Sequence, residues 1–373
     1  MRRRGFDTAV VWGRAAGSHD HAGDVLYLTN HYATSSGLDT RYYQARSFAA
    51  VILQDGQTPE LHTDEPAPRM DIIATDRVQW HLDPIKGVSN ALNERGITGR
   101  VAFVGSNFMP VKYWRQLEVA CPDITWVFQD DLVQVVRRVK SERELDACRI
   151  AGDVVTRALN RLMEGLVLGK LETEAAGDAA REIVRGEGRM QLIACSHGDA
   201  IGYMCRNPLT GYSHEAPAPG DLVRGWIYGP IFQGYYLDPG RTAVARVRPS
   251  TDQRTMIEAS VEIVEELIDA VKPGMEALEL AALGDRLTDA FGGDSDPISE
   301  TYPLYGHGVG LFFEEPRIGT KLAPPGFVFE AGMVLGVEVF LSRNAIGSAA
   351  FEQNIVVGKD GNELLTTSPS YWW

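Results

Sequence analysis

The hydrophobic pattern of the chain changes about a third of the way along. Before that point, short apolar runs alternate with polar turns, at 8–13, 25–30, 47–56 and 101–105. Runs of this length and composition predict strands, and the helix-length segments between them predict α/β packing. Residues 1–135 are therefore predicted to form a small α/β domain.

Helical periodicity dominates the next stretch. Ser141 and Glu144 have the spacing of a capping box, in which each side chain bonds the backbone of the other residue, and apolar residues from 145 to 162 recur at helical spacing. Two more helices are predicted at 251–271 and 276–291, where Lys-Pro-Gly and Gly-Gly are stop signals.

Strand patterns lie between and after these helices, at 220–247, 332–342 and 351–366, the last with a Lys-Asp-Gly turn. Long helices and blocks of strands together predict an α+β domain built on an antiparallel sheet. The chain is therefore assigned to the α+β class, with the smaller domain at 1–135 and the larger at 136–373.

Composition narrows the class of protein. Of the 373 residues, 44% are hydrophobic and 23% are charged, which is typical of a soluble globular protein. The formal net charge of −14 argues against nucleic acid or an anionic membrane as partner, because both require a basic face. No apolar run approaches the length of a membrane span. Four cysteines without CxxC spacing indicate reduced thiols and predict a cytoplasmic protein.

Three carboxylates and one imidazole lie on or beside the predicted strands of the second domain: Asp238, His307, Glu338 and Glu352. Singly, each is better explained as a solvated acid or a satisfied core histidine. Glu338 differs because its neighbours in VLGVEVFL are apolar, so its carboxylate must be paired, protonated or bound to a metal. Together the four suit one divalent ion of Mn, Fe, Co or Zn. No organic cofactor is indicated.

The order and surroundings of these residues resemble the creatinase / aminopeptidase P / prolidase family. The segments that carry the resemblance are GDLV…GYYLDPGRT, GHGVGL…EEP, AGMVLGVEVFL and FEQNIVVGKDGNELLT. The likeness is firm over about 135–366 and looser before that. It implies a pita-bread catalytic domain at 136–373, a creatinase-like domain at 1–135, and a homodimer.

The resemblance also implies five metal ligands, which fall on Ile227, Asp238, His307, Glu338 and Glu352. Isoleucine cannot bind a metal, so we expect at most one ion on the other four residues, and catalysis without a metal stays open. Two acid–base positions of the family differ as well. Arg206 stands where creatinase-type enzymes have a catalytic histidine, and Glu314 stands where aminopeptidases have one, seven residues after His307.

The implied catalytic residues are His307, Glu338, Glu352 and Arg206. Arginine stays protonated at neutral pH, so Arg206 is predicted to hold a substrate carboxylate or a developing oxyanion rather than to act as a base. His197, close to a substrate-side segment of the family, is an alternative base.

Substrate-binding candidates lie in both domains. Arg46 falls on the creatinase arginine that reaches across the dimer to the substrate carboxylate, with Tyr43 near the aromatic position beside it; a surface arginine at a strand start is an equal alternative. Aromatic residues near the motifs are candidates for holding a cationic nitrogen, although core packing explains most of them equally well. They include Trp226, Tyr228 and Phe313.

The predicted function is hydrolysis of a non-peptide C–N bond in a small zwitterionic or amino-acid-derived substrate. The alternative enzyme is a metal-dependent Xaa-Pro peptidase or a lyase of the same fold. An inactive binding protein is the alternative from another class, because expected residues of the family pattern are missing.

Overall fold

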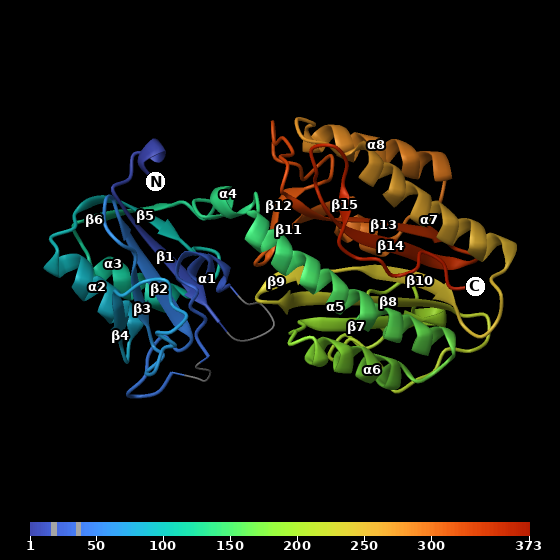
Figure 1. Ribbon diagram of the computed structural model, residues 1–373, viewed down its shortest axis with the longest axis horizontal. Coiled ribbons are helices and arrows are strands. Elements are labelled where there is room, and N and C mark those ends of the chain that lie inside the picture. Colours follow the sequence, from blue (N-terminus) through green and yellow to red (C-terminus); the bar gives the residue numbers. More distant parts are fainter. Residues whose placement is uncertain (16–20, 35–38) are drawn as a thin grey trace. The chain divides into compact units, whose positions relative to one another are not determined.

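The computed structural model describes residues 1–15, 21–34 and 39–373, which divide into two compact units, Met1–Arg137 and Arg138–Trp373 (Figure 1). The N-terminal unit contains a six-stranded sheet in the order β4-β3-β2-β1-β5-β6. Its strands are β1 (Thr8–Arg14), β2 (Phe48–Gln54), β3 (Glu60–Thr63), β4 (Val78–Trp80), β5 (Gly99–Val104) and β6 (Ile124–Phe128). Its helical elements are η1 (Arg2–Arg4), α1 (Gly23–Thr29), α2 (Pro84–Glu94), α3 (Val111–Ala120) and α4 (Gln134–Arg137).

The sheet mixes parallel and antiparallel pairs, as in a small α/β domain. Strand β1 is parallel to β5 and antiparallel to β2. The prediction of a strand at 25–30 was wrong, because that run forms the short helix α1. A four-residue apolar run is compatible with either state. Here Thr29 donates its hydroxyl to the carbonyl of Val25 at 2.7 Å, and Asn30 ends the helix at a φ of 56°.

The C-terminal unit is built on a nine-stranded sheet in the order β12-β11-β13-β14-β10-β8-β7, with β9 paired to β8 and β15 to β14. Every recorded strand pair in it is antiparallel, as predicted. The strands are β7 (Leu192–His197), β8 (Leu222–Phe232), β9 (Tyr235–Leu237), β10 (Gly240–Val244), β11 (Gly306–Val309), β12 (Phe313–Arg317), β13 (Val334–Arg343), β14 (Gly347–Val356) and β15 (Glu363–Leu364).

Helices cover this sheet. They are α5 (Glu142–Val167), α6 (Glu172–Arg185), α7 (Thr251–Ala270), α8 (Ala277–Phe291) and α9 (Pro297–Thr301), with the 3-10 turn η2 (Gly198–Ala200). The predicted capping box at the start of α5 is confirmed, and the backbone N–H of Ser141 donates to the Glu144 carboxylate at 2.8 Å. None of the helices in the described ranges is long and apolar enough to span a membrane.

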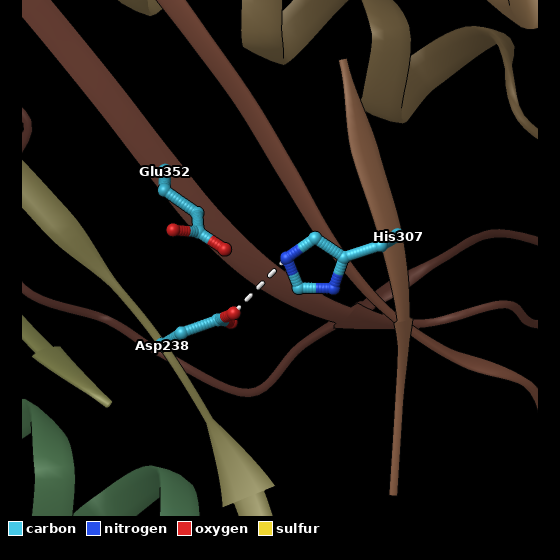
Figure 2. Close-up of side chains that lie close together, drawn as sticks. All are labelled: Asp238, His307 and Glu352. Atoms are coloured by element: carbon cyan, nitrogen blue, oxygen red, sulfur yellow. Dashed lines mark ion pairs between the residues drawn. The ribbon is translucent and has the colours of Figure 1, made fainter. Parts of the chain in front are cut away.

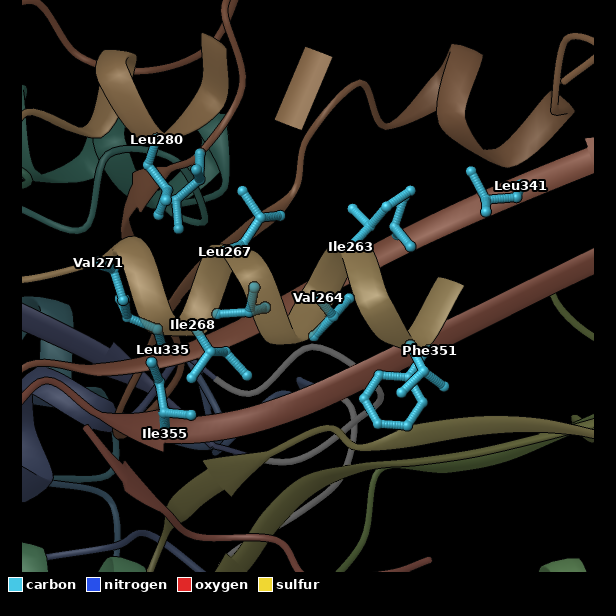
Figure 3. Packing of buried hydrophobic residues seen from close by; sticks show 14 of the residues in the cluster. Ile263, Val264, Leu267, Ile268, Val271, Leu280, Leu335, Leu341, Phe351 and Ile355 are labelled. Carbon is cyan, nitrogen blue, oxygen red and sulfur yellow. The ribbon is translucent and has the colours of Figure 1, made fainter. Parts of the chain in front are cut away.

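Strand alternation separates the core of this unit from its acidic residues. Helix α7 lies along β13 and β14 (Figure 1), and Leu335, Leu341, Phe351 and Ile355 of these strands pack against it (Figure 3). Because successive side chains of a strand point to opposite faces, the even-numbered residues of β13 and β14 face away from α7. Glu338 and Glu352 are such residues, and they lie directly opposite each other in the register of β13 and β14.

Candidate metal and catalytic site

Asp238, His307 and Glu352 come from separate segments and meet on the face of the sheet opposite α7 (Figure 2). Asp238 lies between β9 and β10, His307 on β11 and Glu352 on β14. One ligand atom from each lies within 4.8 Å of the others, and all three side chains are buried. The Nε2 atom of His307 is 3.2 Å from Oδ2 of Asp238.

Glu338 adds a third carboxylate to this group. Its Oε1 atom lies 3.7 Å from Nε2 of His307. The structure thus brings together the four residues that were predicted from the sequence as metal ligands. We call Asp238, His307, Glu338 and Glu352 the acid–histidine cluster.

Backbone and amide contacts hold the cluster in place. Asn354 donates its amide N–H to Oδ1 of Asp238 at 2.7 Å and accepts the backbone N–H of Asp238 at 3.1 Å. Gly336 lies under the carboxylates: a Cβ atom there would overlap Oε1 of Glu352 and lie 3.0 Å from Oδ1 of Asp238. Only glycine lets the two acids come this close to the strand.

Burial and mutual repulsion control the charges of the cluster. Burial raises the pKa of Glu338 to about 7, an effect that His307 opposes and Asp238 reinforces. Burial, together with Asp238 and Glu338, raises the pKa of Glu352 well above its ordinary value. For Asp238, burial is outweighed by the adjacent His307, which lowers the pKa. Burial also opposes the charge on His307, but Asp238 raises the pKa of the imidazole.

These groups fit a divalent cation. Within the described part of the chain, Oε1 of Glu352 is buried and has no side-chain or backbone donor, so a cation or a proton shared with Asp238 is needed to satisfy it. Three carboxylates and one imidazole form a ligand set suited to one transition-metal ion. A metal-free site would instead require protons among the acids.

The fifth ligand position of the family pattern holds no acid. Counting eleven residues back from Asp238 selects Ile227, which pairs with Ile193 of β7 and is fully buried. The neighbouring Gly225 faces α5, since a Cβ there would press on Leu162 and Met163, and alternation places Ile227 on that same helical face.

The neighbouring residue of β8, Trp226, faces the cluster. Trp226 lies opposite Gly240 of β10, and Gly240 lies opposite Glu352 of β14. Its indole Nε1 donates to Oε2 of Glu352 at 2.6 Å. The pairing of β8 with β9 is irregular between Pro230 and Phe232. A count of residues back from Asp238 along the chain therefore does not show which residue of β8 faces the cluster. Neither Ile227 nor Trp226 can ligate a metal. The indole N–H of Trp226 is bonded to Glu352 and its ring stacks on Phe340, and its predicted role in substrate binding stays a prediction.

Glu314, at the position of the aminopeptidase histidine, lies in a buried ion pair. Its Oε2 atom is 2.7 Å from Nζ of Lys140, and the two side chains are 1% and 2% exposed. The same ammonium donates to the carbonyl oxygen of Arg138 at 3.1 Å. A carboxylate held in this way is an anchor for β12 and not a replacement for an acid–base histidine.

Arg206 is not brought into the acid–histidine cluster. Its guanidinium bonds the carboxylates of Asp199 and Glu215, both well exposed, and the carbonyl of His197. These partners compete with any substrate carboxylate, so the predicted catalytic role of Arg206 has no support in its contacts. His197 is buried, with Nδ1 2.6 Å from Oε1 of Glu172. It points to the face opposite that of Trp226 and is not a base for the cluster.

Arg46 and Tyr43 belong to the N-terminal unit. The Arg46 guanidinium lies 3.1 Å from Oδ2 of buried Asp64, and its Cζ atom lies 4.8 Å from the centre of the Tyr43 ring. Ala45 and Ser47, on either side of Arg46, have φ angles of 53° and 68°, in a region uncommon for non-glycine residues. The predicted substrate-binding role of this pair stays a prediction.

Aromatic rings form one wall of the cluster. Phe313 stands edge-on to His307 at 4.9 Å between ring centres, and Tyr228 lies 6.1 Å from Phe313. Tyr236 is 5.7 Å from the same ring. Tyr228 and Phe313 are thus near the site, as expected of substrate-contacting residues.

An antiparallel sheet covered by α7 and a buried acid–histidine cluster on the opposite face are features that the family resemblance implies. Residues 145–359 match Metallopeptidase family M24, and the chain belongs to this family. The predicted resemblance to creatinase, aminopeptidase P and prolidase is thereby confirmed at the level of the family.

Named relatives are peptidases. The chain is 31% identical to the probable dipeptidase PepE of Mycobacterium tuberculosis over 249 residues, which cover 65% of this chain and 62% of PepE. It is 28% identical to the Xaa-Pro dipeptidase of Pyrococcus horikoshii over 243 residues, 64% of this chain and 65% of the relative. The matched part therefore spans less than two thirds of these relatives' length.

Solved structures share the fold over nearly the whole chain. The prolidase from Pyrococcus furiosus superposes with a TM-score of 0.79 at 19% identity, covering 99% of this chain and 98% of the other. Dipeptidase PepE from Mycobacterium ulcerans gives 0.75 at 25% identity, covering 99% and 93%. The predicted pita-bread fold with an N-terminal domain is confirmed by these matches.

Proposed function

We propose that the protein hydrolyses a non-peptide C–N bond in a small amino-acid-derived substrate, at a site that takes at most one metal ion. The observation that carries this proposal is the missing acid on β8. Four residues at ligand positions of the family pattern lie together in the acid–histidine cluster, while Ile227 stands at the fifth position and the adjacent Trp226 bonds Glu352.

The number of ions bears on the type of bond. Two ions can activate water and polarise a carbonyl at the same time, which suits the unreactive peptide bond. A single ion can also support peptide hydrolysis, so the missing acid argues against the two-ion arrangement of a dinuclear peptidase and not against peptide cleavage as such. The buried ion pair of Glu314 with Lys140 also argues against the usual peptidase machinery, because it leaves no acid–base group at the position of the aminopeptidase histidine.

The residues of the acid–histidine cluster would have different roles in the reaction. Asp238, His307, Glu338 and Glu352 would hold the ion, which supplies Lewis-acid polarisation of the bond under attack. Glu338 and Glu352 would orient the attacking water, and one of them would carry its proton toward the leaving nitrogen. His307, whose Nδ1 lies 3.3 Å from the Gly308 carbonyl oxygen, presents Nε2 to the carboxylates.

The substrate class is a compact zwitterion. Acidic side chains and the rings of Phe313 and Tyr228 suit a cationic nitrogen. Arg46 remains the candidate for the substrate carboxylate, in a homodimer, on the strength of the family resemblance.

An Xaa-Pro dipeptidase is the second candidate function. It is favoured by the names of the relatives, which include Xaa-Pro dipeptidases at 28% and 27% identity. For this function, the protein would have to cleave a peptide bond without the fifth metal ligand of the family pattern.

A substrate panel separates the candidates. The purified protein, loaded with Mn²⁺, Co²⁺ or Zn²⁺ in turn, would be assayed on N-carbamoyl, N-acyl and amidino amino acids and on Xaa-Pro dipeptides. We expect kcat/KM for one derivative to exceed that for every dipeptide by ~100-fold or more. Glu352→Gln is the control for contaminating hydrolases and should be inactive. Preferred cleavage of Xaa-Pro dipeptides would establish the second candidate, and metal binding without any turnover would favour a binding protein.

A further inference from the structure

We infer that Trp226 is a positioning residue, which fixes the Glu352 carboxylate so that one oxygen faces the acid–histidine cluster. The inference rests on the proposed function only for the role of Glu352. Trp226 is next in sequence to Ile227, the fifth ligand position of the family pattern, and it bonds Glu352, a residue of the acid–histidine cluster.

The two oxygens of Glu352 have different surroundings. Oε2 accepts the indole N–H of Trp226 at 2.6 Å, in a buried environment where such a bond is not weakened by water. Oε1 is the atom that a Cβ at Gly336 would overlap, beside Oδ1 of Asp238. The indole therefore occupies one oxygen and leaves the other for the cluster.

Trp226 is itself held firmly. Its ring stacks on Phe340 with 5.3 Å between centres and 11° between planes. Its other constraint is Gly240, where a Cβ would overlap the indole ring. Since Gly240 pairs with both Trp226 and Glu352, the three residues cross the sheet in one line. The indole thus has little freedom to rotate, and its N–H direction is fixed by packing.

Loss of the indole N–H should free Glu352 to turn. Partners that orient a metal ligand typically contribute 10- to 100-fold in metal affinity. Trp226→Phe keeps an aromatic ring against Phe340 but removes the donor, so it should weaken Co²⁺ binding by ~10-fold or more.

A matched control lies in the N-terminal unit. Trp12 is 1% exposed and its Nε1 has no hydrogen-bond partner among the described residues. Trp12→Phe therefore removes the same atoms from a core without touching the cluster, and its Co²⁺ affinity should stay within ~2-fold of the wild type. Comparing the Co²⁺ affinities of the two variants separates the loss of the bond to Glu352 from the general effect of replacing a buried tryptophan by phenylalanine.

The experiment combines a spectroscopic and a binding measurement. The seven tryptophans give separate indole N–H signals in ¹⁵N-labelled protein, and the signal missing in Trp226→Phe identifies Trp226. Glu352→Gln should shift that signal, while Co²⁺ titration followed by visible absorption gives the affinities.

An unmoved indole signal in Glu352→Gln, or equal Co²⁺ affinity in Trp226→Phe and Trp12→Phe, would overturn the inference. If the wild type takes up no Co²⁺, the metal part of the proposed function fails, and the indole signal alone then decides the role of Trp226.

Discussion

Removing the imidazole of His307 should lower turnover by ~100-fold or more, the scale of a lost acid–base group or ligand, while the protein still folds. His307 is the nitrogen donor of the cluster and lies 3.2 Å from Asp238 and 3.7 Å from Glu338. Without it, three buried carboxylates face one another with no imidazole between them. His307→Ala should therefore also retain less metal, measured by elemental analysis of the purified variant.

A second buried histidine is the control for this experiment. His31 is 3% exposed, with Nε2 3.0 Å from the Thr63 hydroxyl, and it belongs to the N-terminal unit. His31→Ala should lower the melting temperature without a comparable loss of turnover. Near-wild-type turnover of His307→Ala on the true substrate would contradict the assignment of the active site.

Lys140→Met should destabilise the protein by about 3–5 kcal/mol, because it leaves the Glu314 carboxylate buried without its cation. The two groups are 2.7 Å apart and almost fully buried. The double variant Lys140→Met/Glu314→Leu removes both charges and should recover most of the loss. Denaturant unfolding of the three proteins measures the difference.

An exposed pair provides the comparison. Lys170 lies 2.9 Å from Asp178, and these side chains are 45% and 30% exposed. Lys170→Met should cost less than about 1 kcal/mol, since solvent screens the pair. Equal stability of Lys140→Met and the wild type would mean that Glu314 does not depend on this ion pair.

Local signals in the sequence were sufficient for much of the catalytic unit. Ser141 and Glu144 identified the start of α5 because a capping box depends only on neighbours. Glu338 identified the buried site because a carboxylate in an apolar strand needs a partner. The order of Asp238, His307 and Glu352 within the family motifs did the rest, and the structure places all three together.

Features that depend on strand register or long-range contact could not be predicted in this way. The residue count selected Ile227, whereas the pairing irregularity between β8 and β9 places Trp226 on the face of the cluster. Lys140 and Glu314 are 174 residues apart, and no local pattern links them. Arg206 was assigned to the substrate from its position alone, but Asp199 and Glu215 already bond its guanidinium.

Metal stoichiometry tests the central claim most directly. The protein would be stripped with a chelator, saturated with Mn²⁺, Co²⁺ or Zn²⁺, freed of excess ion by gel filtration and analysed for metal per chain. With four ligands in the acid–histidine cluster and no acid on β8, the account predicts saturation at no more than about one ion per chain. Two tightly held ions per chain, both lost in Asp238→Asn, would contradict it.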